Sequence, residues 1–447
     1  MTTVIVSILI IGLLLIATAR INKMNTAAVA MFMGASCWVL YTIDGSHYVN
    51  EFHLSAFVQS GLDVKSFIAE HIFFKYVVSA AEVVLYLLAT MTIVEILSNN
   101  GCFDFINEGL KTRKPRKFLW MLALFTFILS ANLDNLTTTC LMLSIMHSLV
   151  ANDKLRRVYG FIIVICANMG GAFTVIGDIS SLTLWNSGAV TATQYSAYLA
   201  LPSLVALVTT LLLFSEKLPH RLELVNTIPP YRGDDTILNR WQRFLMLIVG
   251  IGGLWFIPTF HSITALPPFV GALCVLALLW IVNELCNRQL IYSDQMIHRR
   301  FPLALQYANI QNMMFFIGII FAIGAVNETG MLKQFSNLLV GNLQNPYIIG
   351  AAVGLLAAFI NNMTSLVSNI YIFSDVTLLT SDQAFWPLIS FCSTMGGSLL
   401  AMGTIAGIYF VRMENATVAW YLKHCSWRVL VGWLAGLVTF AVMHWLM

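Results

Sequence analysis

The chain has 447 residues, of which 58% are apolar and only 10% are charged. A soluble domain is typically about 45–50% apolar and about 25% charged, so this composition excludes a water-soluble protein and indicates a polytopic membrane protein. The net charge of +3 is too small and too scattered to indicate nucleic-acid binding. The eight cysteines form no CxxC pair, so they indicate neither a disulfide framework nor a zinc site.

The positive charges predict how the chain crosses the membrane, because short loops rich in Lys and Arg stay in the cytoplasm. The apolar run 3–19 is followed by Arg20 and Lys23 and has no basic residues before it, which predicts a first span with an external N-terminus and not a signal peptide. The basic cluster 111–117 is the strongest cytoplasmic signal, and the C-terminus is also predicted outside. Continuous spans are predicted over 26–43, 72–97, 197–214, 244–258, 268–285, 304–326 and 428–446.

Two apolar runs, 118–151 and 346–380, are too long for one span. The first has basic residues at both ends, so a re-entrant hairpin that enters and leaves on the same face satisfies the charge rule better than one helix does. The second run has acidic residues at its far end, which predicts a hairpin entering from outside. Irregular backbone at membrane depth needs protein or water around it, so the tip at 130–139 is expected to line a cavity.

The second half of the chain repeats motifs of the first half in the same order. N132-L-D-N-L-T137 aligns with F359-I-N-N-M-T364 (134 to 361, an offset of 227), and C166-A-N-M-G-G171 aligns with C392-S-T-M-G-G397 (166 to 392, an offset of 226). The charge rule gives the halves opposite orientations, which is the inverted-repeat plan of secondary transporters. We therefore predict an all-α membrane protein of two inverted-topology repeats, each with about five transmembrane helices, one re-entrant hairpin and one broken helix. The predicted parts are a first repeat over 1–214 (hairpin 118–151, broken helix 158–190), a cytoplasmic linker over 215–243 and a second repeat over 244–447 (hairpin 346–380, broken helix 385–411).

Two acidic residues inside apolar runs are the sharpest functional candidates. A carboxylate near the bilayer centre costs about 3 kcal/mol or more, and by default it marks an ion or proton pathway, which singles out Asp134 and Asp178. Gly170, Gly171 and Gly177 are predicted to break the helix 158–190 and so expose carbonyl groups that can bind a small cation. Hard cations prefer oxygen ligands. The oxygen donors near these positions are Asp134, Asn135, Thr137, Asn168, Asp178 and Ser180, with Asn361, Asn362, Thr364, Thr394, Ser398 and Thr404 in the second half.

Simpler interpretations exist for most of these residues. A single Thr, Ser or Asn more often forms a hydrogen bond between packed helices than it binds a cation. Glu82, deep in the span 72–97, is either a proton relay or an interhelical partner. Glu95 and His147 lie near the predicted cytoplasmic ends of their helices, where an interfacial role is expected.

Enzymatic motifs are missing from the chain. HExxH, GxSxG and a Walker loop do not occur, so a transporter is expected and not an enzyme. G177-D178 is similar to the GxGD motif of intramembrane aspartyl proteases, but residue 175 is Val. An intramembrane enzyme or a membrane scaffold therefore stays a remote alternative.

Three motifs carry a family resemblance: A131-N-L-D-N-L-T-T-T139, N168-M-G-G-A-F-T-V-I-G-D-I-S-S181 and M395-G-G-S-L-L-A-M-G-T404. With them, the chain resembles the NhaD-type sodium/proton antiporters of the ion transporter superfamily. The resemblance implies exchange of Na⁺ (or Li⁺) for H⁺ by alternating access, with Asp134 and Asp178 as the shared cation and proton site and a role in pH homeostasis. It implies no cofactor, and a bacterial-type cytoplasmic membrane as the location.

The second hairpin tip departs from that family. Asn361-Asn362 stands where the family usually has Asp-Asn, so one titratable group is lost and the ratio of protons to sodium stays open. The alternative within transport is sodium-coupled uptake of a small anion such as a dicarboxylate, although those relatives carry Ser-Asn-Thr at both tips. The expected partners are sodium ions, protons and the lipid bilayer, with no nucleic acid. The residues do not decide between a monomer and a homodimer.

Overall fold

The computed structural model describes residues 1–215, 218, 219, 221–223, 238–288, 310–342, 345–373, 376, 380 and 382–446. Within these ranges every regular element is a helix, so the predicted all-α class is confirmed. Most of the predicted linker 215–243, the start of the span 304–326 and the end of the hairpin 346–380 lie outside the described residues.

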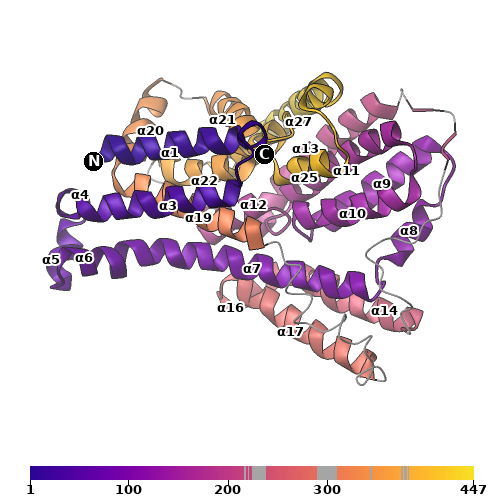
Figure 1. Cartoon of the computed structure of the whole chain (residues 1–447), viewed down its shortest axis with the longest axis horizontal. Coiled ribbons are helices and arrows are strands. Elements are labelled where there is room, and N and C mark those ends of the chain that lie inside the picture. Colours follow the sequence, from indigo (N-terminus) through magenta and orange to yellow (C-terminus); the bar gives the residue numbers. More distant parts are fainter. Residues whose placement is uncertain are drawn as a thin grey trace.

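Figure 1 shows the arrangement of the described helices, coloured along the chain. The first half contains α1 (Thr2–Ala17), α2 (Ala19–Asn22), α3 (Thr26–Ile43), α4 (Gly45–Phe52), α5 (Leu54–Ser60), α6 (Val64–Phe67), the π-helix η1 (Ile68–Phe73), α7 (Phe74–Asn99), α8 (Asp104–Leu110), α9 (Pro115–Ser130), α10 (Asn135–Leu149), α11 (Asp153–Phe173), α12 (Ile179–Asn186) and α13 (Ala192–Ser215). The second half contains α14 (Arg240–Leu247), the π-helix η2 (Ile248–Gly252), α15 (Gly253–Trp255), α16 (Ile257–Thr264), α17 (Pro268–Cys286), α19 (Ile310–Glu328), α20 (Met331–Asn342), α21 (Pro346–Ile360), α22 (Asn362–Phe373), α24 (Phe385–Gly397), α25 (Ile405–Met413), α26 (Val418–Tyr421), the π-helix η5 (Leu422–Ser426) and α27 (Trp427–Leu446).

Several of these helices are long enough to cross a bilayer. In the described part of the chain, six helical segments have the length and apolar composition of a membrane span, and α14–α16 adds a seventh that is bent by 48°. The segment from Val64 to Asn99 is longer than the predicted span 72–97. It extends because Asp63 caps it, accepting hydrogen bonds from the N–H groups of Lys65 and Ser66, and because η1 carries the helix through the polar residues that follow.

The corresponding helices α7 and α19 run in opposite directions. At the end of α7, the Asn100 amide donates to Asn283 Oδ1 near the end of α17 (2.9 Å). At the end of α19, the Glu328 carboxylate accepts a hydrogen bond from Tyr76, near the start of α7 (2.6 Å). The molecule therefore has two ends, with α8 at one and α4, α5 and α20 at the other (Figure 1). We call the end that carries the residues 111–117 the basic face, and the other end the opposite face.

The glycines of the paired Met-Gly-Gly motifs let neighbouring helices cross at close range. Gly170 and Gly171 do not break the helix, because α11 continues through them to Phe173. A Cβ at Gly170 would lie 3.1 Å from the Phe127 Cα and closer still to its carbonyl oxygen, so the missing side chain lets α9 cross α11 at close range. Gly396 has the same relation to Gly354 between α24 and α21. The prediction that this glycine pair interrupts α11 is therefore wrong.

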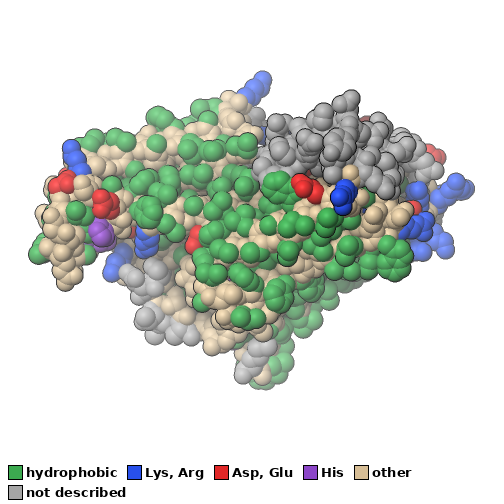
Figure 2. Space-filling model, turned by 90° about the horizontal axis from the view of Figure 1, so that it is seen from below, with side chains coloured by type: hydrophobic (Ala, Val, Ile, Leu, Met, Phe, Trp, Pro, Cys, Tyr) green, Lys and Arg blue, Asp and Glu red, His purple; other side chains and the backbone are tan. Residues whose placement is uncertain are grey.

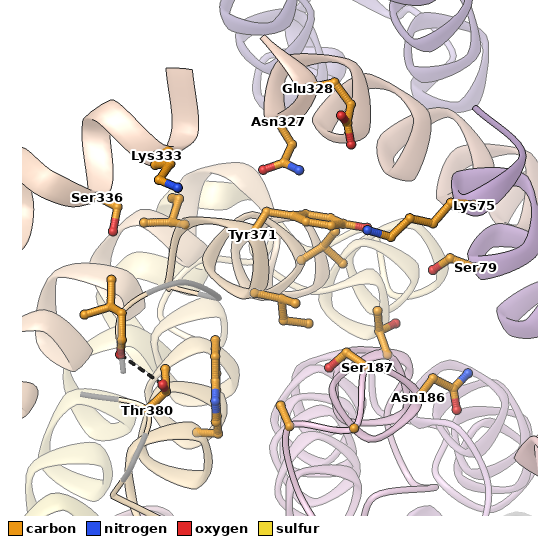
Figure 3. A pocket seen from close by; sticks show the side chains of 18 of the residues that line it. Lys75, Ser79, Asn186, Ser187, Asn327, Glu328, Lys333, Ser336, Tyr371 and Thr380 are labelled. Carbon is orange, nitrogen blue, oxygen red and sulfur yellow. Dashed lines mark hydrogen bonds between the residues drawn. The ribbon is translucent and has the colours of Figure 1, made fainter. Parts of the chain in front are cut away.

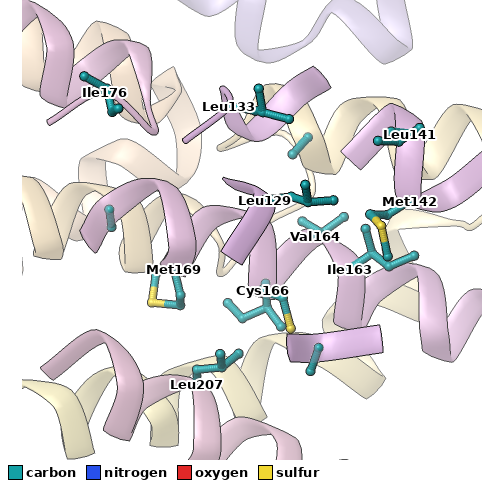
Figure 4. Close-up of a cluster of buried hydrophobic side chains, with 14 of the residues drawn as sticks. Leu129, Leu133, Leu141, Met142, Ile163, Val164, Cys166, Met169, Ile176 and Leu207 are labelled. Atoms are coloured by element: carbon teal, nitrogen blue, oxygen red, sulfur yellow. The ribbon is translucent and has the colours of Figure 1, made fainter. Parts of the chain in front are cut away.

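A continuous apolar core surrounds these crossings. Figure 4 shows buried side chains from both limbs of the first hairpin, α9 and α10, packed against α11, with Leu207 of α13 on the far side. On the side of the molecule shown in Figure 2, hydrophobic side chains are spread over the described surface between the basic face and the opposite face. This distribution matches a protein whose middle section contacts lipid.

We expect Gly170→Ala to lower the apparent melting temperature in detergent, because the added methyl group collides with the α9 backbone. Overpacking of this kind costs about 1–3 kcal/mol. Gly252→Ala is the matched control, since a Cβ there meets only Ile248 at an ordinary 3.7 Å. Equal melting temperatures for the Gly170 variant and the control would contradict the close crossing.

Candidate functional site

The two hairpins turn inside the protein, and each tip carries an Asx-Asn pair. Between α9 and α10, Asp134 is the N-cap of α10, and its carboxylate accepts hydrogen bonds from the N–H of Thr137 (2.9 Å) and from the Thr137 hydroxyl. Between α21 and α22, Asn361 has φ +80° and ψ 142°, a backbone conformation that residues other than Gly rarely adopt. Its Oδ1 accepts from the N–H of Met363 (3.1 Å). The corresponding residues Asp134 and Asn361 therefore hold their turns in different ways.

Two further helix interruptions lie against these tips. The chain leaves helical geometry between α11 and α12, and Asp178 is the N-cap of α12, accepting a hydrogen bond from the Ser180 hydroxyl. The corresponding interruption lies between α24 and α25, where Thr404 caps α25 by accepting from the N–H of Gly407 (3.1 Å). Each interruption points the N-terminus of a half-helix, which carries about half a positive charge, into the protein interior.

Side-chain amides cross between the two halves at the centre of the protein. Asn135 donates to Asn168 Oδ1 (3.3 Å), and Asn168 donates in turn to Ser398 Oγ (2.9 Å) and Thr404 Oγ1 (3.3 Å). In the reverse direction, Asn362 donates to Asp178 Oδ2 (3.0 Å). Each hairpin tip is thus linked to the helix interruption of the other half. We call these side chains the crossing network: Asn135, Asn168, Ser398 and Thr404, and Asn362 with Asp178.

The resulting site is acidic and rich in oxygen atoms. Asp134 and Asp178 are 2% and 3% exposed. Neither carboxylate bonds to Lys or Arg among the described residues; hydroxyl groups, backbone N–H groups and one amide surround them instead. Thr138 and Thr364 add buried hydroxyls without a hydrogen-bond partner. Such a site can hold a hard cation or protons in exchange.

The structure brings most of the predicted site residues together, but not all. Asn361 does not bond to the crossing network, and Glu82 lines a cavity toward the opposite face. The hydroxyls of Ser130 and Ser393, which the sequence analysis missed, fasten the tips to the broken helices. Their only sequence signal is their place, since Ser130 directly precedes the first tip motif and Ser393 lies within C392-S-T-M-G-G397. The predicted residues joined directly by hydrogen bonds are Asp134 with Thr137; Asn168 with Asn135, Ser398 and Thr404; and Asp178 with Ser180 and Asn362.

Two cavities approach the site from opposite ends of the molecule. The larger, about 1020 Å³, opens toward the opposite face and reaches Thr183 of α12; Figure 3 shows Lys75, Glu328 and Tyr371 around it. The smaller, about 430 Å³, lies toward the basic face and ends at Leu136 and Asn361 beside the hairpin tips. One cavity therefore lies toward each end of the molecule, and neither is lined by Asp134 or Asp178.

The fold and the site define the class of protein: a multi-pass membrane transporter. Residues 13–372 match the family model described as "Citrate transporter". Sodium/proton antiporter 2 of Arabidopsis thaliana is 32% identical over 97% of this chain and 98% of its own length. The Na(+)/H(+) antiporter NhaD of Vibrio parahaemolyticus is 26% identical over 83% of this chain and 90% of its own.

The chain belongs to the family of this model and is related to the NhaD-type sodium/proton antiporters. The resemblance predicted from the motifs is therefore confirmed. Because the relatives are named as transporters, the prediction that the chain is not an enzyme is also confirmed. In fold, the chain resembles the crystal structure of the YdaH transporter of Alcanivorax borkumensis, with a TM-score of 0.52 and 11% identity over 84% of this chain and 88% of that one.

We expect Asn168→Ala to destabilise the protein, because it leaves Asn135 and Ser398 with broken hydrogen bonds in a fully buried region. The loss of buried partners costs about 1–3 kcal/mol. Thermal unfolding in detergent measures it, with Asn99→Ala as the control, since the Asn99 amide donates to Glu95 on its own helix. A melting temperature no lower than that of the control would show that these hydrogen bonds contribute little to the stability of the protein.

Proposed function

We propose that the protein exchanges Na⁺ (or Li⁺) for H⁺ across a bacterial-type cytoplasmic membrane, with Asp134 and Asp178 as the shared site. One observation carries the proposal: two buried carboxylates, each capping a half-helix, meet where amides link the two halves. The names of the relatives support the same ions. No cofactor is required, because the transported ions are the only reactants.

Competition between the ions follows from charge. With both carboxylates ionised, the mutual repulsion of Asp134 and Asp178 is relieved by a cation or by protons. A bound Na⁺ finds oxygen ligands in the carboxylates, in the hydroxyls of Thr137 and Ser180 and in the neighbouring amides. Protons neutralise the same oxygens, so loading with one ion expels the other. Since Asn361 and Thr404 replace carboxylates in the second half, the site accepts at most two protons.

Alternating access is proposed to follow from inverted repeats. The opposite directions of α7 and α19, the reciprocal links between tips and interruptions and the two cavities on opposite faces all support this arrangement. In this proposal the basic face is cytoplasmic, because Lys and Arg collect there. Glu82, on the wall of the larger cavity, would relay protons between the external solution and the site.

We expect Asp134→Asn and Asp178→Asn each to abolish sodium-dependent dissipation of a preformed proton gradient in everted vesicles. Each variant removes a charge that both ions need. A pH-sensitive fluorescent dye reports the gradient, and Asp63→Asn, an exposed helix cap on the opposite face, should behave as the wild type. Exchange that continues unchanged in the Asp134 variant would overturn the assignment of the site.

We expect the Na⁺ concentration that gives half-maximal exchange to rise as the pH falls, because protons and sodium compete for the same carboxylates. The same vesicle assay measures this with Na⁺, Li⁺ and K⁺ at several pH values. A half-maximal Na⁺ concentration independent of pH would argue for separate cation and proton sites.

The family description "Citrate transporter" makes sodium-coupled uptake of a small anion the second candidate function. The described site offers no Lys or Arg to bind a carboxylate ligand, which favours the cation exchanger. Uptake of labelled succinate driven by Na⁺ into proteoliposomes distinguishes the two, since an exchanger should show none above the level of empty liposomes.

A further inference from the structure

A buried acidic residue that the proposed exchange does not use lies on the basic face. Glu414, directly after α25, has a side chain that is 2% exposed. Its carboxylate accepts a hydrogen bond from Arg156 Nε (3.2 Å) and lies 3.2 Å from His147 Nδ1. The Glu414 carbonyl oxygen also accepts from Arg157 (3.4 Å). We call His147, Arg156 and Glu414 the Glu414 clamp.

The clamp joins three helices that carry the site. His147 lies in the last turn of α10, whose N-cap is Asp134, and Arg156 lies in the first turns of α11, which carries Asn168. Glu414 lies at the end of α25, whose N-cap is Thr404. The two helices of the first half are therefore tied to one helix of the second half, at the ends nearest the basic face.

Among the described residues, the corresponding place at the end of α12 has no such tie, and the carboxylate that a histidine binds on the opposite face, Glu328 with His53 (2.7 Å), lies at the end of α19 instead. With the offset of 226 between the halves, Glu414 corresponds to Gly188 at the end of α12, which lines the larger cavity. On the basic face, Arg412 and Asn415 on either side of Glu414 line the smaller cavity. The larger of the two cavities, about 1020 Å³ against about 430 Å³, lies on the face without the clamp.

We propose that the Glu414 clamp is a proton-sensitive gate that holds the basic face closed and must open for ions to enter from that side. The proposal rests on the alternating access proposed above. A buried carboxylate bound by a guanidinium and an imidazole holds α25 against α10 and α11. If His147 or Arg156 moves away, the Glu414 carboxylate is left buried and incompletely paired. Its charge is then stabilised only if water reaches it, which favours widening of the smaller cavity.

His147 makes the gate respond to pH. Its ring lies 3.2 Å from the Glu414 carboxylate, and a protonated ring attracts that carboxylate more strongly than a neutral ring does. The other charged groups around it are Arg156, Arg157 and Asp153 of α11, where Asp153 pairs with Arg156. The adjacent helix α9 carries Arg116 and Lys117 in its first turn. Acid on the basic side therefore closes the gate, and alkali releases it.

Cys140 offers a native reporter for this opening. It lies half-buried on α10, and its thiol contacts the hydroxyl of Tyr409, which lines the smaller cavity. In sealed vesicles we expect Glu414→Gln to raise the rate at which a membrane-impermeant maleimide, added on the basic side, labels Cys140 roughly tenfold. Mass spectrometry of the Cys140 peptide measures the rate.

The control is Asp104→Asn, which makes the same carboxylate-to-amide change in an ion pair with Arg243 (2.8 Å) on the same face, away from the cavity. Its Cys140 labelling should match the wild type. His147→Gln, at a more exposed position, provides a second test if the Glu414 variant does not fold. Wild-type labelling should fall relative to His147→Gln as the pH drops from about 8 to about 6.

Labelling and exchange are measured separately, so the two proposals fail separately. Cys140 labelling at the wild-type rate in both Glu414→Gln and His147→Gln would overturn the gate even if sodium exchange proceeds. An equal increase in Asp104→Asn would also overturn it, because any loss of charge on that face would then suffice. If Cys140 is labelled faster in the Glu414→Gln variant but the wild-type protein shows no sodium exchange, the gate is supported and the proposed ion exchange is refuted.

Discussion

The burial of two carboxylates at the centre of a membrane protein is the constraint on which the rest of this structure depends. Asp134 and Asp178 have no basic partner among the described residues, so other groups must stabilise their charge. The N-termini of α10 and α12, two hydroxyls and one amide do so. Helix N-termini and neutral hydrogen-bond donors stabilise a buried carboxylate without neutralising its charge.

The interrupted helices and the hairpins are consequences of that constraint. A continuous helix satisfies its own backbone groups and offers no N–H to a carboxylate, so α11 and α24 must end inside the protein. The exposed backbone then needs protein around it, which the hairpin tips supply. Close crossings at Gly170 and Gly396 bring the tips within reach. The residues that surround the two carboxylates are therefore also residues that hold the fold together.

The two halves have diverged where their symmetry would place equivalent charges. The first half supplies Asp134 and Asp178, whereas the second supplies Asn361 and Thr404 at corresponding positions. The halves are linked where Asn362 of the second half donates to Asp178 and where Asn168 of the first half donates to Thr404. The ends differ as well, since the basic face carries the Glu414 clamp and the opposite face carries the larger cavity.

The sequence by itself determined the membrane class and the family, and it predicted Asp134 and Asp178 as the centre of the site, because charges are so scarce that these two residues stand out and because the motifs repeat. Only the tertiary structure decided that the Met-Gly-Gly pairs are helix crossings, that Asn135 reaches the second half through Asn168, and that Glu414 is buried beside His147. These facts depend on contacts between segments far apart in the chain. Local spacing carries no information about such contacts, since a glycine that interrupts a helix and one that admits a neighbouring backbone look the same in sequence.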